Sequence, residues 1–383
     1  MRPSHNRIPS NAVVLAAVST FFVLATEHSA AQVIATGGCD TYSPDVNETV
    51  TCDVNGTNPD DTGVQTPKNN TTINGVTVNV DSDVVLAVSG STIGLGAGTT
   101  VDNRGTLRAG KLRFAYGVSA GVNGRSMAGG NTVTNRASGV VLTQGSDAHG
   151  IYINARQSDA ADNVITNAGT ITTTGSRADG IRLYTSSTAA QDSITNSGSI
   201  TTSGVSASGI HVQNNKTQTA ISNSGTIVVN DASGYGILID GAANVTNSGT
   251  IQVDPSGYAL YVEDNGNTNA NTLTIALGSD ITGALRFSST RTAEKLIFAT
   301  GLGTGSGPFE LNNTITGLNQ VEAKSGSEVT LGADSYDLVD AVVTTESNAT
   351  LEIAGDVSGT GGLVKDGLGQ LRLSGANSYV GGT

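Results

Sequence analysis

The stretch Ile165-Thr-Asn167-Ala-Gly169-Thr-Ile171 decides the fold, because the same pattern returns along the chain. In each copy an aliphatic residue stands two positions before an asparagine, and a glycine, a hydroxyl residue and a second aliphatic residue follow. The other copies begin at Val101, Val133, Ile194, Ile221 and Val245, and the Val133 copy carries one extra residue. The asparagines are Asn103, Asn135, Asn167, Asn196, Asn223 and Asn247, spaced 32, 32, 29, 27 and 24 residues apart. Self-similarity at a period of roughly 20–50 residues indicates a repeat architecture.

A second landmark follows each asparagine after 12 to 15 residues. It is a small residue before alternating apolar positions, at Gly117-Val118, Gly150-Ile151, Gly180-Ile181, Gly209-Ile210, Gly236-Ile237 and Ala259-Leu260. Alternation with period two predicts strands, so we expect two short strands in each unit. One unit cannot bury its few aliphatic side chains alone, but stacked units bury a continuous column. The pattern therefore predicts an all-β protein, a single-stranded right-handed parallel β-helix (β-solenoid).

The recurring asparagine has two interpretations. Stacked at one corner of successive coils, the six side-chain amides can bond to one another in a structural ladder, as in cross-β assemblies. Alternatively, they form a row of ligand contacts on the surface. We favour the ladder.

The composition fits a narrow core and excludes some partners. Charged residues make up 13% of the chain and aromatic residues 4%, whereas glycine occurs 50 times. Such a chain favours one elongated solenoid over several globular domains. The formal net charge of −13 repels nucleic acid and anionic membrane, so we expect no nucleic-acid partner.

The N-terminal residues have the features of a secretory signal peptide. A basic start at Arg2 and Arg7 precedes an apolar run from Ala12 to Ala25, and small residues follow up to Ala31. We expect a signal peptide at residues 1–31, a cap with the first coils at 32–99, and regular β-helix repeats at 100–267. A less regular β-helix is expected at 268–383.

The two cysteines, Cys39 and Cys52, lie close together after the expected signal peptide. In an exported protein such a pair is expected to form a disulfide. A metal site is disfavoured, because the next histidine in the chain is His149.

The residues that would carry catalysis are sparse. His149 and His211 stand at positions that vary between units, so we expect both side chains to point outward and neither to be catalytic. Gly117-Val-Ser119-Ala-Gly121 matches a nucleophile elbow in spacing, but no helical pattern follows it. Gly105 to Lys111 has the spacing of a phosphate loop, but Leu112 replaces its Ser or Thr. We therefore expect no enzyme, no cofactor and no metal.

One segment differs from the acidic background. Between Asn103 and Ser146 there is no Asp or Glu, whereas Arg104, Arg108, Lys111, Arg113, Arg125 and Arg136 are basic. The segment predicts either a solvated face or a contact with anionic glycan or lipopolysaccharide.

The last residues resemble a known family. Gly361-Gly-Leu363-Val-Lys365-Asp-Gly367-Leu-Gly369-Gln-Leu371-Arg-Leu373-Ser-Gly375-Ala-Asn377-Ser-Tyr379-Val-Gly381-Gly-Thr383 closely resembles the autotransporter-associated β-strand repeat, which we assign to residues 351–383. The resemblance implies the passenger region of a bacterial autotransporter, a structural or adhesive β-helix whose partners are host or bacterial surface glycans or proteins.

The resemblance also implies a C-terminal β-barrel translocator, which we expect to be absent from this chain because the sequence stops within the motif. The chain is then a fragment or a truncated product. As part of a full autotransporter it is placed at the cell surface or outside the cell, and otherwise in the periplasm. The alternatives are a passenger scaffold of a secreted hydrolase with its catalytic part elsewhere, or an inactive truncated product.

Overall fold

The computed structural model of the chain describes residues 37–56, 62–66, 74–120, 129–155, 162–186, 191–264, 269–291, 293–305, 307–332, 335–358 and 362–381. Residues 34–383 form one compact unit, and they are described by themselves below. The expected signal peptide lies outside the described residues. No helix long and apolar enough to cross a membrane occurs in the described part of the chain.

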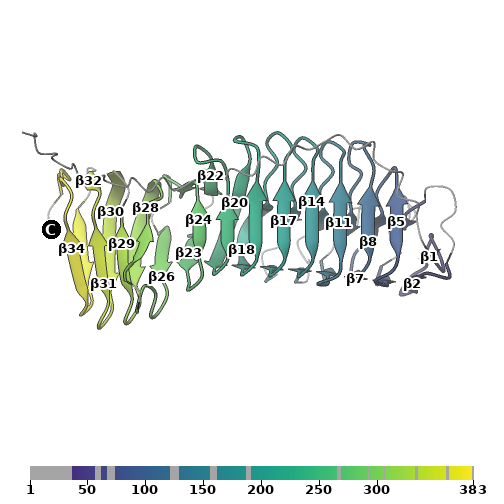
Figure 1. Cartoon of the computed structure of the whole chain (residues 1–383), viewed down its shortest axis with the longest axis horizontal. Helices are drawn as coiled ribbons and strands as arrows, with labels where there is room; N and C mark the ends of the chain where they lie inside the picture. The colour runs from purple at the N-terminus through teal and green to yellow at the C-terminus, as the bar shows by residue number, and fades with distance from the viewer. Residues whose placement is uncertain are drawn as a thin grey trace, which may run out of the picture. The chain divides into compact units, whose positions relative to one another are not determined.

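The unit is a stack of coils whose strands pair in parallel with those of the next coil (Figure 1). The all-β, parallel β-helix fold predicted from the repeats is confirmed. The expectation of two strands in each unit is wrong, since a regular coil has three, such as β13 (Val164–Asn167), β14 (Thr170–Thr173) and β15 (Ile181–Thr185). The Asn-x-Gly motif is itself a corner, where the chain turns from one strand to the next within two residues.

The strands make three faces along the stack. The first face contains β2 (Thr49–Asp53), β4 (Thr77–Val80), β7 (Thr100–Asn103), β10 (Thr132–Asn135), β13, β16 (Ser193–Asn196), β23 (Thr272–Ile275), β26 (Lys295–Phe298) and β33 (Leu363–Asp366). The second face contains β5 (Val85–Val88), β8 (Thr106–Ala109), β11 (Val140–Thr143), β14, β17 (Ser199–Thr202), β19 (Thr226–Val229), β21 (Thr250–Gln252), β24 (Asp280–Thr282), β27 (Phe309–Leu311), β29 (Glu328–Leu331), β31 (Thr350–Ile353) and β34 (Gln370–Leu373).

The third face contains β3 (Val64–Gln65), β6 (Ile93–Gly94), β9 (Val118–Ala120), β12 (Ile151–Ala155), β15, β22 (Tyr258–Val262), β25 (Ala284–Arg286) and β32 (Asp356–Ser358). Longer strands turn the corner from the third face to the first face of the following coil: β18 (Ile210–Asn223), β20 (Tyr235–Asn247), β28 (Ile315–Ala323) and β30 (Ser335–Thr345).

The stack stays in register because equivalent residues of each repeat lie opposite one another. Ile165 pairs with Val133 on one side and with Ile194 on the other, so aliphatic side chains of successive coils form one column. These residues are buried, as are Ile171 on the second face and Ile181 on the third. The core is thus a narrow tube of Val, Ile and Leu, which explains how a chain with so few aromatic residues buries enough surface to fold.

The first strand, β1 (Gly38–Cys39), covers the N-terminal edge of the first face. It pairs antiparallel with β2, and Cys39 lies opposite Cys52. A disulfide joins the two cysteines, and both are buried. On its other side β2 pairs in parallel with β4, so β1 covers an edge that would otherwise expose unpaired backbone groups.

Candidate functional site

The six repeat asparagines lie inside the solenoid and form the expected ladder. The Nδ2 of each residue from Asn103 to Asn223 donates a hydrogen bond of 2.7 Å to the Oδ1 of the next asparagine along the stack. All six side chains are buried. The column runs between Val80 and Ile275, which take the same place in the flanking coils. The interpretation as a row of surface contacts is therefore wrong.

A second ladder, which the sequence interpretation missed, stands four residues before the first. Asn131 Nδ2 donates to Asn163 Oδ1 at 2.8 Å, and Asn163 Nδ2 donates to Asp192 Oδ1 at 2.8 Å. Further along the stack Asn271 Nδ2 donates to Glu294 Oε1 at 3.0 Å. The signal was present in the sequence, since Asn131, Asn163 and Asp192 precede the repeat asparagines at a constant spacing.

The basic residues of the segment after Asn103 are partly neutralised by carboxylates at its borders. Arg104 and Arg136 contact the two oxygens of Asp102 at 3.0 and 2.8 Å. Arg113 contacts Asp147 at 2.8 Å, and Arg177 of the following coil contacts the same carboxylate at 2.8 Å. Several basic residues of the segment are thus neutralised, although the segment itself has no Asp or Glu. The acidic partners lie just outside the segment and are brought close by the stacking of coils.

Two of the predicted basic residues keep their charge available. Lys111 is exposed and Arg108 is half-buried, and within the described residues neither side chain makes a hydrogen bond or an ion pair. Arg125 lies outside the described residues. The basic surface is thus centred on Arg108 and Lys111, with Arg104 and Arg113 at its margins.

Beside this charge the chain has a longer turn than its neighbours. Four residues separate Gly110 from Ala115, whereas two separate Gly145 from Ala148 and two separate Gly175 from Ala178. The extra residues project from the stack, and Leu112 and Phe114 are 58% and 50% exposed. We call residues 111–114 the basic–apolar loop.

The basic–apolar loop has a fixed internal arrangement. Phe114 has a φ of 61°, which is unfavourable for an aromatic residue and which Asp147 and Arg177 share in the next two coils. The Arg113 guanidinium lies 4.5 Å from the centroid of the Phe114 ring, a cation–π contact. A cavity of about 480 Å³ adjoins the loop and is lined by Gln65, Gly90, Ser91, Gly94, Leu112, Arg113, Phe114, Ala115, Tyr116 and Ser119.

His149 lies in an aromatic cluster behind this loop. Its ring stacks on Tyr116 with a centroid distance of 5.7 Å, and Tyr152 lies 5.3 Å away. The expected outward position is wrong, because His149 is buried beneath neighbouring coils. Burial lowers the pKa of His149 to about 4, and the charges of Arg182 and His211 act in the same direction. Burial also raises the pKa of Tyr116.

Behind the cluster, Asp179 makes hydrogen bonds to residues of both the preceding and the following coil. Its Oδ1 accepts the Ser208 N–H at 2.8 Å, and its Oδ2 lies 3.1 Å from His211 Nδ1. Its own N–H donates to His149 Nδ1 at 3.0 Å, so the His149 proton sits on Nε2 and the 3.5 Å contact to the carboxylate is not an ion pair. Burial raises the pKa of Asp179, but the hydrogen bond to His211 and the neighbouring basic side chains together outweigh it, and the pKa is lowered. His211, only partly exposed, is thus an internal partner of Asp179, and the expected outward position is wrong for it too.

We predict that His149 makes the protein acid-labile below neutral pH. The folded pKa of about 4 lies below the ordinary value of 6.5, so between these values the unfolded chain binds more protons. Stability is full above pH 6.5 and falls as the pH drops, by about 2–3 kcal/mol near pH 4.5. His149→Asn, which keeps an acceptor for the Asp179 N–H, should flatten this slope in urea titrations followed by circular dichroism.

Comparing the pH dependence of the free energy of unfolding in the wild-type protein and in the variant separates the contribution of His149 from those of other titrating groups. Burial raises the pKa of Glu294 to about 7, which makes stability fall as pH rises, but this contribution is present in both proteins and cancels. Parallel slopes for the wild-type protein and the variant between pH 6.5 and 4.5 would show that His149 does not titrate as described.

The chemical motifs considered in the sequence are parts of the β-helix. Ser119 of the Gly-x-Ser-x-Gly match is buried in β9, and its Oγ lies 3.4 Å from the carbonyl oxygen of Ile93. The residues with phosphate-loop spacing include strand β8, whose Thr106–Ala109 backbone is paired on both sides. Among the described residues no group of three or more His, Cys, Asp or Glu side chains could hold a metal ion.

Stacked parallel strands with an interior asparagine ladder define a pectate lyase-like parallel β-helix. The family described as the BigA third pectate lyase-like domain matches residues 45–290, well over half of the chain. The chain belongs to this family. No curated protein matches the chain, and no solved structure matches it. The terminal motif that resembles the autotransporter-associated repeat lies beyond the matched residues.

Proposed function

We propose that the chain is an adhesive, non-enzymatic β-helix segment of an exported bacterial surface protein, and that it contacts anionic glycans. The observation that carries the proposal is the basic–apolar loop, where a longer turn exposes Leu112 and Phe114 beside Lys111. The terminal repeat motif and the signal-peptide features support export and a passenger role.

The geometry of the loop suits a sulfated or carboxylated sugar. Arg108 and Lys111 supply positive charge that the described residues do not neutralise, and anions attract such groups over about 8–10 Å at ordinary ionic strength. Phe114 and Leu112 supply apolar surface for the faces of sugar rings, and the adjoining cavity of about 480 Å³ falls within the size range of ligand sites.

The histidine and aspartate groups support a non-enzymatic role. The Nδ1 of His149 accepts a backbone N–H, and Asp179 accepts hydrogen bonds from Ser208 and His211, so these groups hold coils together. A general base needs a lone pair that can reach a substrate proton, which this arrangement does not offer.

We predict that reversing the two available charges strongly weakens glycan binding. Arg108→Glu with Lys111→Glu should weaken binding to an immobilised heparin surface about thirtyfold or more, because two attractive contacts of about 1 kcal/mol each are lost and repulsion replaces them. Surface plasmon resonance at low and moderate salt measures the effect, and wild-type binding should weaken as salt rises.

The control carries the same charge change elsewhere. Lys365→Glu with Arg372→Glu alters two exposed residues of β33 and β34 and should leave heparin binding within about twofold of wild type, because neither residue lies on β8 or in the basic–apolar loop. Equal losses in both double variants would show that binding follows net charge alone, against the proposal. Release of new reducing ends from heparin or polygalacturonate by the wild-type protein would contradict the non-enzymatic part.

A further inference from the structure

The second face of the solenoid is interrupted at one place where the other two faces continue. The eight-stranded sheet of this face ends at β24, and a separate four-stranded sheet begins at β27 in the next coil. On the first face of these coils β23 pairs with β26, and on the third face β25 pairs with β28. The two coils are therefore in contact on two faces and spread apart on the third, so that β24 and β27 are both edge strands within the described residues.

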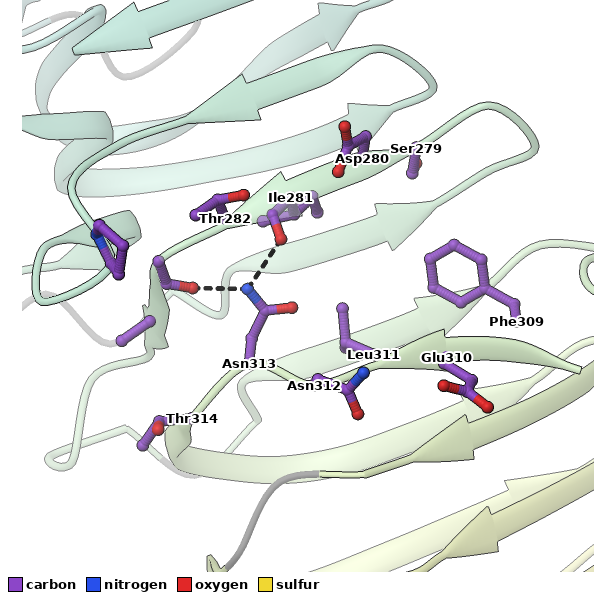
Figure 2. A pocket seen from close by; sticks show the side chains of 13 residues that line it. Ser279, Asp280, Ile281, Thr282, Phe309, Glu310, Leu311, Asn312, Asn313 and Thr314 are labelled. Atoms are coloured by element: carbon purple, nitrogen blue, oxygen red, sulfur yellow. Dashed lines mark hydrogen bonds between the residues drawn. The ribbon is translucent and has the colours of Figure 1, made fainter. Parts of the chain in front are cut away.

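A cavity of about 440 Å³ fills the space between these two edges, and Figure 2 shows its lining. Asp280 N–H donates to the Gly249 carbonyl on the paired side of β24, so by alternation the backbone groups of Ile281 face the gap. The side-chain amide of Asn313 reaches across and donates to the carbonyl oxygens of Ile281 and Gly283, at 3.0 and 2.6 Å (Figure 2). The Asn313 side chain thus supplies hydrogen bonds that the backbone of a neighbouring strand supplies in other coils.

Along both edges, exposed polar side chains alternate with buried or half-buried aliphatic ones. This alternation indicates which kind of strand could lie between the edges. On β24, Asp280 and Thr282 are exposed, whereas Ile281 between them is half-buried. On β27, Glu310 is exposed and Leu311 is buried. A strand lying between the two edges would meet carboxylates on its outer side and aliphatic side chains on its inner side.

We propose that this gap binds an extended polypeptide segment with alternating basic and apolar residues, which adds as a strand between β24 and β27. Backbone hydrogen bonds to the two edges supply affinity, as in other cases of strand addition, and on β24 they replace those of the Asn313 amide. Basic side chains of the segment pair with Asp280 and Glu310, since opposite charges on adjacent strands stabilise a sheet.

The same charges disfavour the simplest other occupant. A second copy of this chain would bring its own β24 or β27 edge, and Asp280 or Glu310 would then face carboxylates of like charge. Glu328, exposed on the strand beyond β27, adds to the negative charge. The partner is thus a different, basic segment.

The test uses a labelled hexapeptide, acetyl-Val-Lys-Val-Lys-Val-Lys-amide, and the full chain, with binding read by fluorescence anisotropy. We expect saturable binding by the wild-type protein. Asp280→Asn with Glu310→Gln should weaken it at least fivefold at low salt, and Asp81→Asn with Asp83→Asn, the same charge change in a remote exposed turn, should leave it unchanged. A peptide with N-methylated valines, which lacks the N–H groups that would face one of the two edges, should bind at least tenfold more weakly.

Two results would overturn the proposal. The first is equal affinity of the peptide for the wild-type protein and the Asp280→Asn, Glu310→Gln variant, or equal affinity of the N-methylated peptide. The second is a dimer in sedimentation velocity that becomes tighter in that variant, because removal of like charges would then have strengthened pairing between two copies at this edge. Neither outcome depends on heparin binding by the basic–apolar loop.

Discussion

Replacement of Asn196 by alanine is expected to lower the free energy of unfolding by about 3–5 kcal/mol. Asn196 Oδ1 accepts the amide of Asn167, and Asn196 Nδ2 donates to Asn223, both at 2.7 Å in a fully buried column. The alanine variant leaves the amide of Asn167 without its main acceptor and the carbonyl of Asn223 without its donor. Each buried group without a partner costs about 1–3 kcal/mol, and the lost side-chain volume adds a cavity.

Urea unfolding followed by circular dichroism measures this effect. Asn230→Ala is the matched control, because Asn230 is an exposed asparagine at the end of β19, and its replacement should change the free energy of unfolding by less than about 0.5 kcal/mol. A loss for Asn196→Ala as small as that of the control would mean that the ladder amides exchange freely with water, and that the column does not hold the coils together.

The fold and the first ladder could be predicted from the sequence for the same physical reason. Equivalent residues of a stacked repeat contact each other, so a position that recurs in sequence becomes a column in space. Asn167 lies opposite Asn135 and Asn196, which is what the repeat spacing implies. The number of strands in each coil was predicted wrongly, because the corner after Asn167 takes only two residues and does not interrupt the apolar pattern.

The polar network around Asp179 could have been predicted by the same reasoning. His149, Asp179 and Ser208 each precede the repeated glycine, and a column argument would have placed them together. Their variation between repeats instead suggested outward positions. Variation in one column of a solenoid also arises when the side chain of one coil accepts a hydrogen bond from the backbone of the next, as the His149 ring does from Asp179 and the Asp179 carboxylate does from Ser208.

The gap between β24 and β27 could not be predicted from the repeats. Leu273 and Leu296 pair normally on the first face, and Leu285 and Ile315 pair on the third, so most of the chain in these coils follows the pattern. The chain between β26 and β27 is longer than the chain between β23 and β24, but this length alone does not say that the second face spreads apart. Such a displacement is a property of stacking in three dimensions, and residue spacing does not record it.

Replacement of Gly198 by alanine should destabilise the protein by about 3 kcal/mol, although only one methyl group is added. A Cβ at this corner would lie 2.1 Å from the carbonyl oxygen of Gly169 and 2.6 Å from the carbonyl carbon of Ala168, both backbone atoms of the preceding coil. Parallel strands pair at about 4.8 Å, so the corner can yield only if hydrogen bonds between β13 and β16 lengthen. Overpacking of a close-packed site costs about 1–3 kcal/mol, and backbone atoms relax less than side chains.

Gly90→Ala is the control, because a Cβ there meets nothing within 4 Å. The control should be neutral or more stable by about 0.4–1 kcal/mol, since alanine restricts the unfolded chain. Opposite signs for the same substitution would show that contact between coils, rather than backbone freedom, requires glycine at the Asn-x-Gly corner. If Gly198→Ala instead unfolds at the same urea concentration as Gly90→Ala, the coils must separate at this corner without loss of pairing. The glycine would then reflect the local turn conformation alone, and the recurrence of Gly169, Gly198 and Gly225 would need no stacking constraint.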